Sequence, residues 1–555
     1  MRAKDTSRSA TVDLRSIRWR AGDRRIQMAL AERPAAAFEP GATIQTNRRR
    51  TLHAVVLGVE DAGDDNREGS RDRRRVLLKT HHLATGRHRL REAIKRSLRR
   101  SPARREWRAL VALQAAGVPA PRPLAYGRLA SGDELIALEL VEGVALRERF
   151  ANADAATRDR LVANLSATLA RLHASGHVHG DLHLGNLWAR SGTDEIVLLD
   201  LQRLRRSADK AARLRDLASL ELSLLRAEWP AAAREAVREK LAALVPHALE
   251  ARGDFIAALQ NFAADHVRGR MRRRRRPGRG LERVRVERRC GLRDESISES
   301  ELLRLLERAR ESPTRRTRRG GESWIAEAEL GAKAVVVKWR AEGGLGRRFL
   351  ARLRGTSAAR AFGRGLREQR LLARSARPLA WLEQRLAGLP GESWLVLERV
   401  GEFDLDAYRP ADPAEARGLA RELADWLADL HSLGQSHADL KGSNLRIRPA
   451  ASDAEPPRFW LVDLEDLRGP EALGDEARLT ALSQLNASIP DAHFGPDARR
   501  EMLARYLARL PFEDAKLQLE PASAEIARRS LARRHRWRGE SCAAGHSVVT
   551  VSQRK

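Results

Sequence analysis

Cysteine is almost absent from this chain of 555 residues, which contains only Cys290 and Cys542. Two cysteines exclude a disulfide framework and a four-cysteine zinc site, and they favour a reducing compartment. The sequence also lacks an uninterrupted apolar stretch long enough to span a bilayer. Residues 1–20 lack the apolar core of a signal peptide. We therefore expect a cytoplasmic protein, or one that lies peripherally on a membrane.

Lysine is also scarce, with ten lysines among 104 basic residues. Against 74 acidic residues, the formal net charge is +30. Two explanations stay open: codon bias in a GC-rich genome, or an anionic partner such as acidic or phosphorylated lipid or nucleic acid. Charge alone predicts no specific nucleic acid. Because lysines are few, a lysine at a motif position is more informative here than in an average chain.

The chain repeats itself. Leu161–Asn186 aligns without a gap to Leu419–Asn444, which lies 258 positions later. Both segments have leucines at spacings of four, four and three, which is the apolar stripe of an α-helix, and then His, Asp and Asn in register. Apolar strands that end in Lys, Glu and Asp recur at similar offsets, and they end at Lys79 and Lys338, Glu139 and Glu398, and Asp200 and Asp463. The repeat predicts two copies of one domain.

The repeat gives a domain organisation for most of the chain. We predict an N-terminal extension over 1–45, one domain over 46–266, a linker over 267–290 and a second domain over 291–555. Within the first domain, Asp61–Arg73 is polar and glycine-containing and lies between two apolar runs. This segment is predicted to form a long hairpin loop.

The predicted linker is rich in arginine. Residues 267–290 contain twelve Arg and two Glu. Arg272–Arg276 precede Pro277-Gly278, and adjacent like charges followed by Pro-Gly disfavour a packed element. Two interpretations stay open: a solvated linker, or contact of Arg268–Arg289 with an anionic membrane surface.

The polar loop after the long predicted helix has the pattern H-x-D-x-x-x-x-N, followed by an apolar strand that ends in Asp. This combination is typical of kinase-like enzymes. We predict that Asp181 aligns the acceptor hydroxyl for in-line attack. Asn186 and Asp200 supply hard oxygen ligands for Mg²⁺. His179 is better explained as a residue that braces the loop than as a base.

A lysine and a glutamate complete the pattern. Lys79 ends an apolar strand and is predicted to neutralise the α- and β-phosphates of ATP. Glu106 lies in a predicted helix over Ala103–Leu113 and is predicted to hold Lys79 in place. Glu139, at the end of another apolar strand, is assigned with these two to the ATP-binding residues.

The second copy repeats the pattern in register, so coincidence is a poor explanation for either. By the same reasoning, Asp439 is the predicted catalytic residue and His437 the residue that braces its loop. The remaining predicted site residues of this copy are Lys338, Glu398 and Lys441 for ATP, and Asn444 and Asp463 for Mg²⁺.

The second copy departs from the first at the helix acid. A gapless alignment places Ala361 opposite Glu106, and Glu368, seven residues later, could serve only if the helix is shifted. Lys441 stands where protein kinases often place a lysine on the γ-phosphate, whereas the first copy has His183. Either copy is a candidate for the sole active one, and the complete Lys–Glu pair favours the first.

Neither copy has a G-x-G-x-x-G loop before its lysine, nor the Phe and Gly of a D-F-G triplet. These absences argue against an ordinary protein kinase. His179–Leu187 (HGDLHLGNL) is similar to the Brenner-type motif of small-molecule and lipid kinases. Ser101–Leu124, Leu198–Arg206 and Arg478–Ile489 resemble the bacterial lipopolysaccharide kinase family, which comprises the Kdo kinase, WaaP-type heptose kinases and InaA-like relatives.

The resemblance implies an α+β chain of two tandem protein-kinase-like domains, each with a small β-rich N-lobe and a larger helical C-lobe. It also implies ATP-dependent phosphorylation of a sugar hydroxyl of an anionic glycolipid, the lipopolysaccharide inner core, at the cytoplasmic face of the inner membrane. Two alternatives stay open: a membrane-associated regulatory protein whose domains bind nucleotide but do little chemistry, and a protein kinase. We expect acceptor specificity to lie in the least patterned segments, Ser207–Asn261 and Asp466–Lys555.

Overall fold

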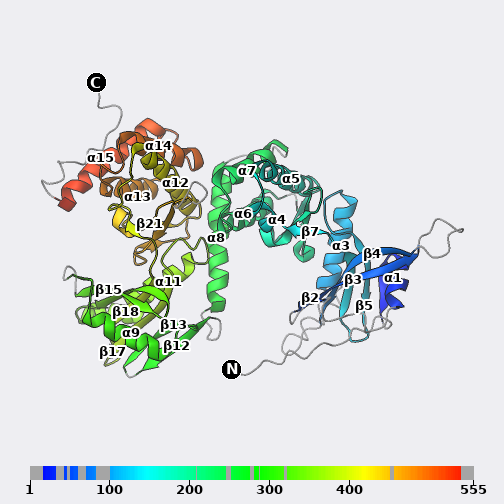
Figure 1. Ribbon diagram of the computed structural model, residues 1–555, viewed down its shortest axis with the longest axis horizontal. Coiled ribbons are helices and arrows are strands. Elements are labelled where there is room, and N and C mark those ends of the chain that lie inside the picture. The colour runs from blue at the N-terminus through cyan, green and yellow to red at the C-terminus, as the bar shows by residue number, and fades with distance from the viewer. Residues whose placement is uncertain are drawn as a thin grey trace. The chain divides into compact units, whose positions relative to one another are not determined.

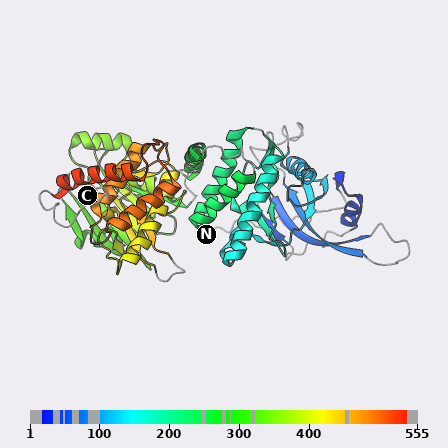
Figure 2. The ribbon, with the colours of Figure 1, turned by 90° about the horizontal axis from the view of Figure 1, so that it is seen from above.

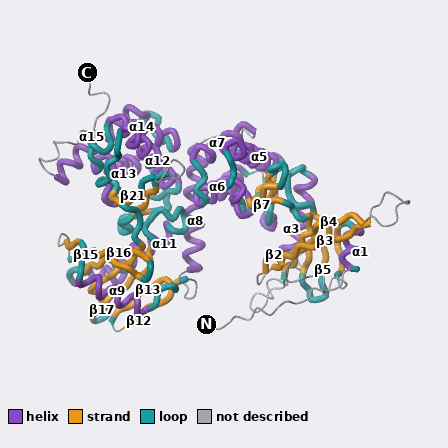
Figure 3. Tube along the Cα trace, viewed as in Figure 1, coloured by secondary structure: helices purple, strands orange, loops and turns teal. Residues whose placement is uncertain are grey.

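The structure is a computed structural model. It describes residues 17–32, 43–46, 50–60, 71–82, 101–207, 209–244, 252–274, 280–286, 288–317, 322–450 and 456–538. The chain divides into two compact units, Met1–Arg252 and Gly253–Lys555 (Figure 1). In each unit the strands gather mainly in one lobe and the helices in the other (Figure 3).

The small lobe of the first unit is a six-stranded antiparallel sheet in the order β1-β5-β6-β4-β3-β2. Its strands are β1 (Arg18–Gly22), β2 (Thr43–Thr46), β3 (Arg50–Glu60), β4 (Arg71–His81), β5 (Pro123–Arg128) and β6 (Glu134–Glu139). Helices α1 (Arg24–Ala31) and α3 (Pro102–Ala115) accompany it. β3 and β4 form a long hairpin, drawn in blue in Figure 2. Of the predicted hairpin loop, 71–73 belong to β4, and 61–70 lie outside the described residues.

The large lobe of the first unit is built around α5 (Ala155–Ala174). Asp154 caps this helix by accepting a hydrogen bond from the Thr157 N–H, and the leucine stripe read from the sequence is buried. The other helices are α4 (Leu146–Ala151), α6 (Lys210–Arg226) and α7 (Ala231–Leu244). Short strands form two small sheets: β7 (Gly143–Ala145), β9 (Leu187–Arg190) and β10 (Ile196–Leu198) in one, β8 (His177–Val178) and β11 (Arg205–Arg206) in the other.

The small lobe of the second unit is a seven-stranded antiparallel sheet in the order β12-β13-β17-β18-β16-β15-β14. Its strands are β12 (Leu281–Val286), β13 (Arg289–Asp294), β14 (Arg315–Thr317), β15 (Ser323–Leu330), β16 (Lys333–Ala341), β17 (Pro378–Leu386) and β18 (Leu389–Glu398). α9 (Glu299–Glu311) begins with a capping box between Ser298 and Glu301. Its apolar face packs on the sheet. α10 (Leu345–Arg354) and α11 (Ser357–Glu368) follow β16.

The large lobe of the second unit repeats the plan of the first. α12 (Pro413–Ser432) carries the second leucine stripe, which is buried. Helices α13 (Asp475–Ser488), α14 (Pro496–Arg509) and α15 (Leu519–Arg538) pack with it around one apolar core. Short strands β19 (Phe403–Asp404), β20 (Ser436–His437), β21 (Leu445–Arg448), β22 (Arg458–Leu461) and β23 (Leu467–Arg468) frame the polar loop.

The Arg-rich segment 267–290 contains regular structure wherever it is described. Its first residues belong to α8 (Arg252–Arg274), and its last residues to β12 and the start of β13. β13 pairs with β17, so these strands extend the sheet of the second unit. The two units accordingly divide after Arg252, upstream of the segment. Residues 275–279 and 287, and the side chains of 272–274, lie outside the described part of the chain.

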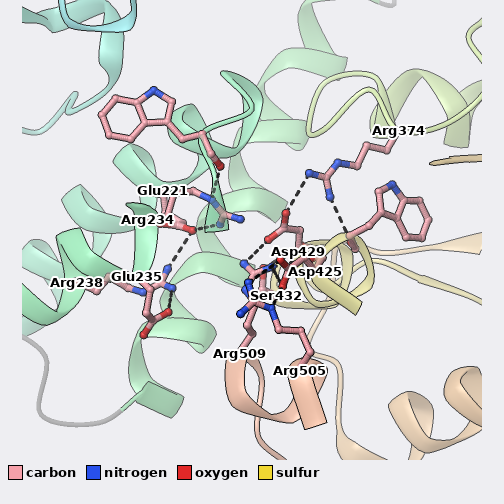
Figure 4. Close-up of polar contacts among 12 residues, drawn as sticks. Glu221, Arg234, Glu235, Arg238, Arg374, Asp425, Asp429, Ser432, Arg505 and Arg509 are labelled. Carbon is pink, nitrogen blue, oxygen red and sulfur yellow. Dashed lines mark hydrogen bonds and ion pairs between the residues drawn. The ribbon is translucent and has the colours of Figure 1, made fainter. Parts of the chain in front are cut away.

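Arginines paired with acidic residues connect helices within each unit (Figure 4). In the first, Arg234 donates to Glu221 at 2.6 Å and to the Trp229 carbonyl at 3.1 Å. In the second, Arg509 donates to Asp429 at 2.6 Å, and Arg505 makes two 2.9 Å bonds to Asp425. Breaking the Arg234–Glu221 pair, whose side chains are 3% and 5% exposed, would leave an uncompensated buried charge. Part of the arginine content therefore serves the fold. Among the described residues, no helix is long and apolar enough to cross a membrane.

Candidate active sites

A buried ion pair lies between the sheet and α3 in the first unit. Lys79 in β4 points its Nζ at Glu106 Oε1, 2.6 Å away, and both side chains are buried. α3 is positioned by Ser101, whose hydroxyl accepts from the Arg104 N–H. Burial opposes ionisation of Glu106, but Lys79 and then His81 outweigh it, so the pKa of Glu106 is lowered. Glu106 thus stays ionised and holds the lysine.

Lys79 also lies near Asp200, the aspartate that follows β10. Its Nζ lies 3.5 Å from Asp200 Oδ1, and Arg50 Nη1 lies 3.0 Å from Asp200 Oδ2. Burial would raise the pKa of Asp200, but the two cations outweigh it and lower the pKa. Sequence reasoning missed Arg50, because it begins β3 some 150 positions before Asp200 and belongs to no motif. Gln202 donates to Glu106 Oε2 at 3.4 Å.

The polar loop of the first unit is folded on its own backbone. Asn186 Nδ2 donates to the Asp181 carbonyl at 2.9 Å, so its side-chain oxygen is the atom left for a cation. The Asp181 carboxylate is 40% exposed, and Arg203 Nη1 lies 3.5 Å from it. His179 lies with its Nε2 3.0 Å from the Leu199 carbonyl, next to Asp200. The structure therefore brings Asp181, Asn186 and Asp200 to one region, with His179 bonded to the backbone.

A buried carboxylate that sequence reasoning missed anchors this loop. Asp216 in α6 accepts the backbone N–H groups of His179 at 2.5 Å and Gly180 at 2.8 Å. Burial raises the pKa of Asp216 to about 6, although both N–H groups act in the opposite direction. The Ser223 hydroxyl accepts from the Leu184 N–H at 3.1 Å. Neither residue lies near the motif in sequence, so only the packing of α6 reveals them.

The two strand-end glutamates lie apart from these ion pairs. Glu139 accepts from Arg190 Nη1 at 2.8 Å and from the Arg122 N–H at 3.2 Å. Burial opposes ionisation of Glu139, but these hydrogen bonds outweigh it and lower its pKa. In the second unit the Glu398 N–H donates to the Arg377 carbonyl at 2.9 Å. A part for either residue in ATP binding stays a prediction.

The second unit keeps the lysine and the strand-end aspartate. Lys338 in β16 lies 3.4 Å from Asp463 Oδ1 and donates to the Val462 carbonyl at 3.2 Å. Burial would raise the pKa of Asp463, but Lys338 and His437 outweigh it and lower the pKa. Ala361 on α11 is fully buried in the apolar core.

Glu368 does not take the place of the missing helix acid. It ends α11 and accepts hydrogen bonds from the Ser375 hydroxyl at 2.6 Å and the Arg374 N–H at 2.7 Å. Burial raises its pKa. Another acid, Glu465, follows Asp463 by two residues and pairs with Arg340 at 3.1 Å. Glu465 therefore stands where the first unit has Gln202.

The polar loop of the second unit keeps the bond from its Asn side chain to the Asp carbonyl and differs in its other contacts. Asn444 Nδ2 donates to the Asp439 carbonyl at 2.8 Å, and His437 Nε2 lies 2.7 Å from the Asp463 carbonyl. Lys441 Nζ lies 2.7 Å from Asp439 Oδ2. In the first unit the matching residue, His183, instead lies 3.2 Å from Asn186 Nδ2.

An amide anchors the second loop where a carboxylate anchors the first. Gln484 in α13 accepts the Leu440 N–H at 2.9 Å and donates to the Ala438 carbonyl at 2.7 Å. Ser488 accepts the Gly442 N–H at 2.8 Å, as Ser223 does for Leu184. The serine anchor is therefore common to both units, and the other anchor is not.

The residues present fit a magnesium ion in each unit. In each unit the Asn lies beside the residue that precedes the Asp, since the Leu199 N–H donates to the Asn186 carbonyl at 2.9 Å and the Val462 N–H to the Asn444 carbonyl at 3.2 Å. Mg²⁺ in phosphoryl-transfer enzymes takes one or two protein oxygens plus phosphate and water. Among the described residues, no group of three or more His, Cys, Asp or Glu could hold a metal by itself. Asn186 with Asp200, and Asn444 with Asp463, would hold the ion only together with phosphate oxygens.

Comparison with known protein families gives one match that covers both units. The sequence model of the lipopolysaccharide kinase (Kdo/WaaP) family matches residues 59–240 and 308–506, one segment in each unit. No curated protein matches the chain.

Solved structures that resemble the chain include WaaP in complex with acyl carrier protein, at 19% identity and a TM-score of 0.30, covering 44% of this chain and 97% of that one. Another is the PknI kinase domain of Mycobacterium tuberculosis, at 17% identity and a TM-score of 0.24, covering 41% and 96%. A third is WbdD with a kinase inhibitor, at 17% identity and a TM-score of 0.24, covering 37% and 44%.

Proposed function

Because the chain belongs to the lipopolysaccharide kinase (Kdo/WaaP) family, whose members are kinases, we propose that it phosphorylates a sugar hydroxyl of an anionic glycolipid, the lipopolysaccharide inner core, with ATP. The predictions of the family and of two tandem kinase-like α+β domains are confirmed, since each unit contains one matched segment. The acceptor and its hydroxyl belong to the proposal.

The observation that carries the proposal is the buried Lys79–Glu106 pair beside Asp200. Glu106 holds the ammonium group where it neutralises the phosphates of the nucleotide. Asp181, half exposed on its loop, accepts a hydrogen bond from the acceptor hydroxyl and aligns its oxygen for in-line attack. Asn186 and Asp200 would hold Mg²⁺, which when bound neutralises charge on the phosphate oxygens. Asp216 keeps the loop in place through His179 and Gly180.

A phosphate-transfer assay with a soluble acceptor tests this function. The full chain is incubated with ATP, Mg²⁺ and deacylated lipopolysaccharide inner core. A sugar phosphate monoester, seen by phosphorus NMR and as an added phosphate by mass spectrometry, is the expected product. Phosphate on protein side chains alone would favour the protein kinase instead. Nucleotide binding with no transfer to either acceptor would favour a regulatory protein.

The second unit supports a regulatory function more than the first does. Lys338 has Asp463 beside it, but the helix position that holds Glu106 in the first unit is the apolar Ala361. A lysine without its glutamate is less firmly held against the phosphates. Nucleotide binding with little turnover is therefore the second candidate function, confined to this unit.

A membrane-anchored acceptor would also give the Arg-rich segment a role. We propose that Arg268–Arg289 contributes to contact with anionic lipid on the cytoplasmic face of the inner membrane. Such contact is electrostatic, so it weakens with salt over a Debye length of about 8 Å at physiological ionic strength. Replacing Arg272–Arg276 with Gln and measuring co-sedimentation with anionic vesicles tests this part. If the variant sediments with anionic vesicles as the native chain does, the segment is solvated and does not contact lipid.

A further inference from the structure

α10 turns its apolar side away from the protein. It lies between β16, which carries Lys338, and α11, and its sequence is LGRRFLARLR. Leu345, Phe349, Leu350 and Leu353 expose between 44% and 72% of their surface. Residues four apart share one face of a helix, so Leu345, Phe349 and Leu353 form a stripe with Leu350 beside it. An amphipathic helix of a globular domain normally buries this side.

The polar side of α10 is the one attached to the protein. Arg348 donates to the Pro390 carbonyl at 2.9 Å, and Arg352 to the Gly388 carbonyl at 2.9 Å. Both carbonyls belong to the β17–β18 hairpin. Ala351, on the same side, is the buried residue of the helix. These contacts fix the rotation of α10, so the outward apolar stripe is a consequence of the fold and not of a loosely held segment.

The segment of chain that contains the stripe carries positive charge only. Gly343–Arg367 contains seven arginines and no lysine, aspartate or glutamate. Arg347 and Arg354, at the two ends of α10, are exposed. Leu386, exposed at the end of β17, contributes a further apolar side chain next to Gly391, which Arg348 also contacts. The surface thus joins an apolar stripe about 15 Å long to a basic border.

We infer that α10 docks the second unit on an anionic lipid bilayer, with its axis along the surface and its apolar stripe among the acyl chains. A bilayer with acidic headgroups complements both parts of this surface. Its apolar layer matches the stripe, and its negatively charged headgroups match the basic border. A second copy of the chain would bring seven more arginines against these seven, and like charges disfavour that contact. The inference shares a membrane-held acceptor with the proposed function, and it adds an apolar contact to the electrostatic contact proposed for Arg268–Arg289.

Vesicle binding by the full chain tests the inference, without nucleotide or acceptor. The probes are vesicles of phosphatidylcholine, and vesicles of equal parts phosphatidylcholine and phosphatidylglycerol. The native chain should bind the mixed vesicles, and part of this binding should survive added salt because it is apolar. The variant exchanges three stripe residues, and its binding to mixed vesicles should be at least about tenfold weaker. The three exchanges are Leu345→Gln, Phe349→Gln and Leu353→Gln.

A matched control exchanges three exposed apolar residues outside α10. Vesicle binding of this control should equal that of the native chain. Its exchanges are Met28→Gln, Val111→Gln and Leu244→Gln. All six positions are exposed, so both variants should fold, and equal circular dichroism and melting profiles check this.

Three results would overturn the inference. The stripe variant could bind mixed vesicles as tightly as the native chain, or the native chain could ignore them. Sedimentation velocity could show a native dimer that the stripe variant loses, with vesicle binding unchanged, which would make α10 an interface between copies. Phosphorylation of the soluble deacylated core is measured in parallel. Its absence in the native chain would refute the proposed function and leave the vesicle result standing.

Discussion

The two kinase-like units agree in the groups that would touch metal and acceptor, and they differ in the groups that hold these in place. Asp181, Asn186 and Asp200 correspond to Asp439, Asn444 and Asp463, with the same amide-to-carbonyl bond in each loop. Lys79 has a buried glutamate partner, whereas the residue of α11 that aligns with Glu106 is the buried Ala361. Repetition has therefore preserved the reacting groups more closely than their supports.

The loop anchors differ in charge as well. Asp216 accepts two N–H groups, whereas Gln484 accepts one and donates to a carbonyl. A carboxylate has acceptor sites only, and an amide has both kinds, so each anchor matches the backbone groups that its loop presents. The anchor of the first loop is consequently titratable, and the anchor of the second is not.

Exchange of the catalytic aspartates should give the largest effect. Asp181→Ala should lower kcat by roughly 10²–10⁴-fold and leave ATP binding nearly unchanged, because Asp181 is predicted to contact the acceptor and not the nucleotide. Asp439→Ala is the matched variant in the second unit. Steady-state turnover and nucleotide binding are measured for both. Native turnover in Asp181→Ala would assign the activity to the second unit or refute the mechanism.

The second-largest effect should be a pH dependence of loop stability that distinguishes the first loop from the second. Burial raises the pKa of Asp216 from 3.8 to about 6, so the folded loop keeps a proton that the unfolded chain has lost. Loop stability should therefore fall as the pH rises between these values, by up to about 3 kcal/mol, and then stay constant. Hydrogen exchange of residues 177–186 measures it, with residues 435–444 as the comparison.

Asp216→Asn is the control for this slope of loop stability against pH. It should abolish the slope, and it should lower protection at every pH because an amide oxygen faces only one of the two N–H groups. Arg205 and Asp181 make smaller contributions to the pKa of Asp216 and stay in place in the variant. A slope that persists in Asp216→Asn, or that is equal in residues 435–444, would contradict the assignment.

The lysine partners should give a smaller effect. Glu106→Gln removes one charged hydrogen bond from Lys79. The transition-state stabilisation measured by kcat/KM should therefore weaken by about 1.5–3 kcal/mol. Ala361→Glu makes the reverse change and should tighten nucleotide binding by the second unit. Each variant is assayed with the catalytic aspartate of the other unit replaced. No change on Ala361→Glu would mean that α11 does not face Lys338 as α3 faces Lys79.

Metal dependence should give the smallest effect. Chelation of Mg²⁺ should weaken ATP binding about tenfold in both units, since each has one Asn and one Asp oxygen for the ion. Asp200→Asn and Asp463→Asn should each remove this dependence in their own unit only. Isothermal titration with and without chelator measures it. Indifference to Mg²⁺ in both units would make the regulatory, nucleotide-binding protein the leading function.

Much of the fold could be predicted from local pattern. The leucine stripes of α5 and α12 are periodic, and short apolar runs lead to Lys79, Lys338, Asp200 and Asp463, so each pattern predicts its element without help from distant residues. The strands β4 and β16 continue past their lysines to His81 and Ala341, and β10 and β22 end before their aspartates. The Arg-rich segment was harder. β12 and β13 have little apolar periodicity of their own, and they are strands because β17 offers an edge with which to pair.

The sequence by itself determined two kinase-like copies and predicted the reacting residues of each, because D-x-x-x-x-N spacing and apolar periodicity are local properties. Tertiary structure alone decided which residues support them. Arg50 reaches Asp200, and Asp216 reaches the loop backbone, only after the sheet and α6 have packed. It also decided the face of α10, because Arg348 and Arg352 are held by the carbonyls of a neighbouring hairpin. A helical pattern predicts an apolar side, and only the packing around it tells whether that side faces the core or the solvent.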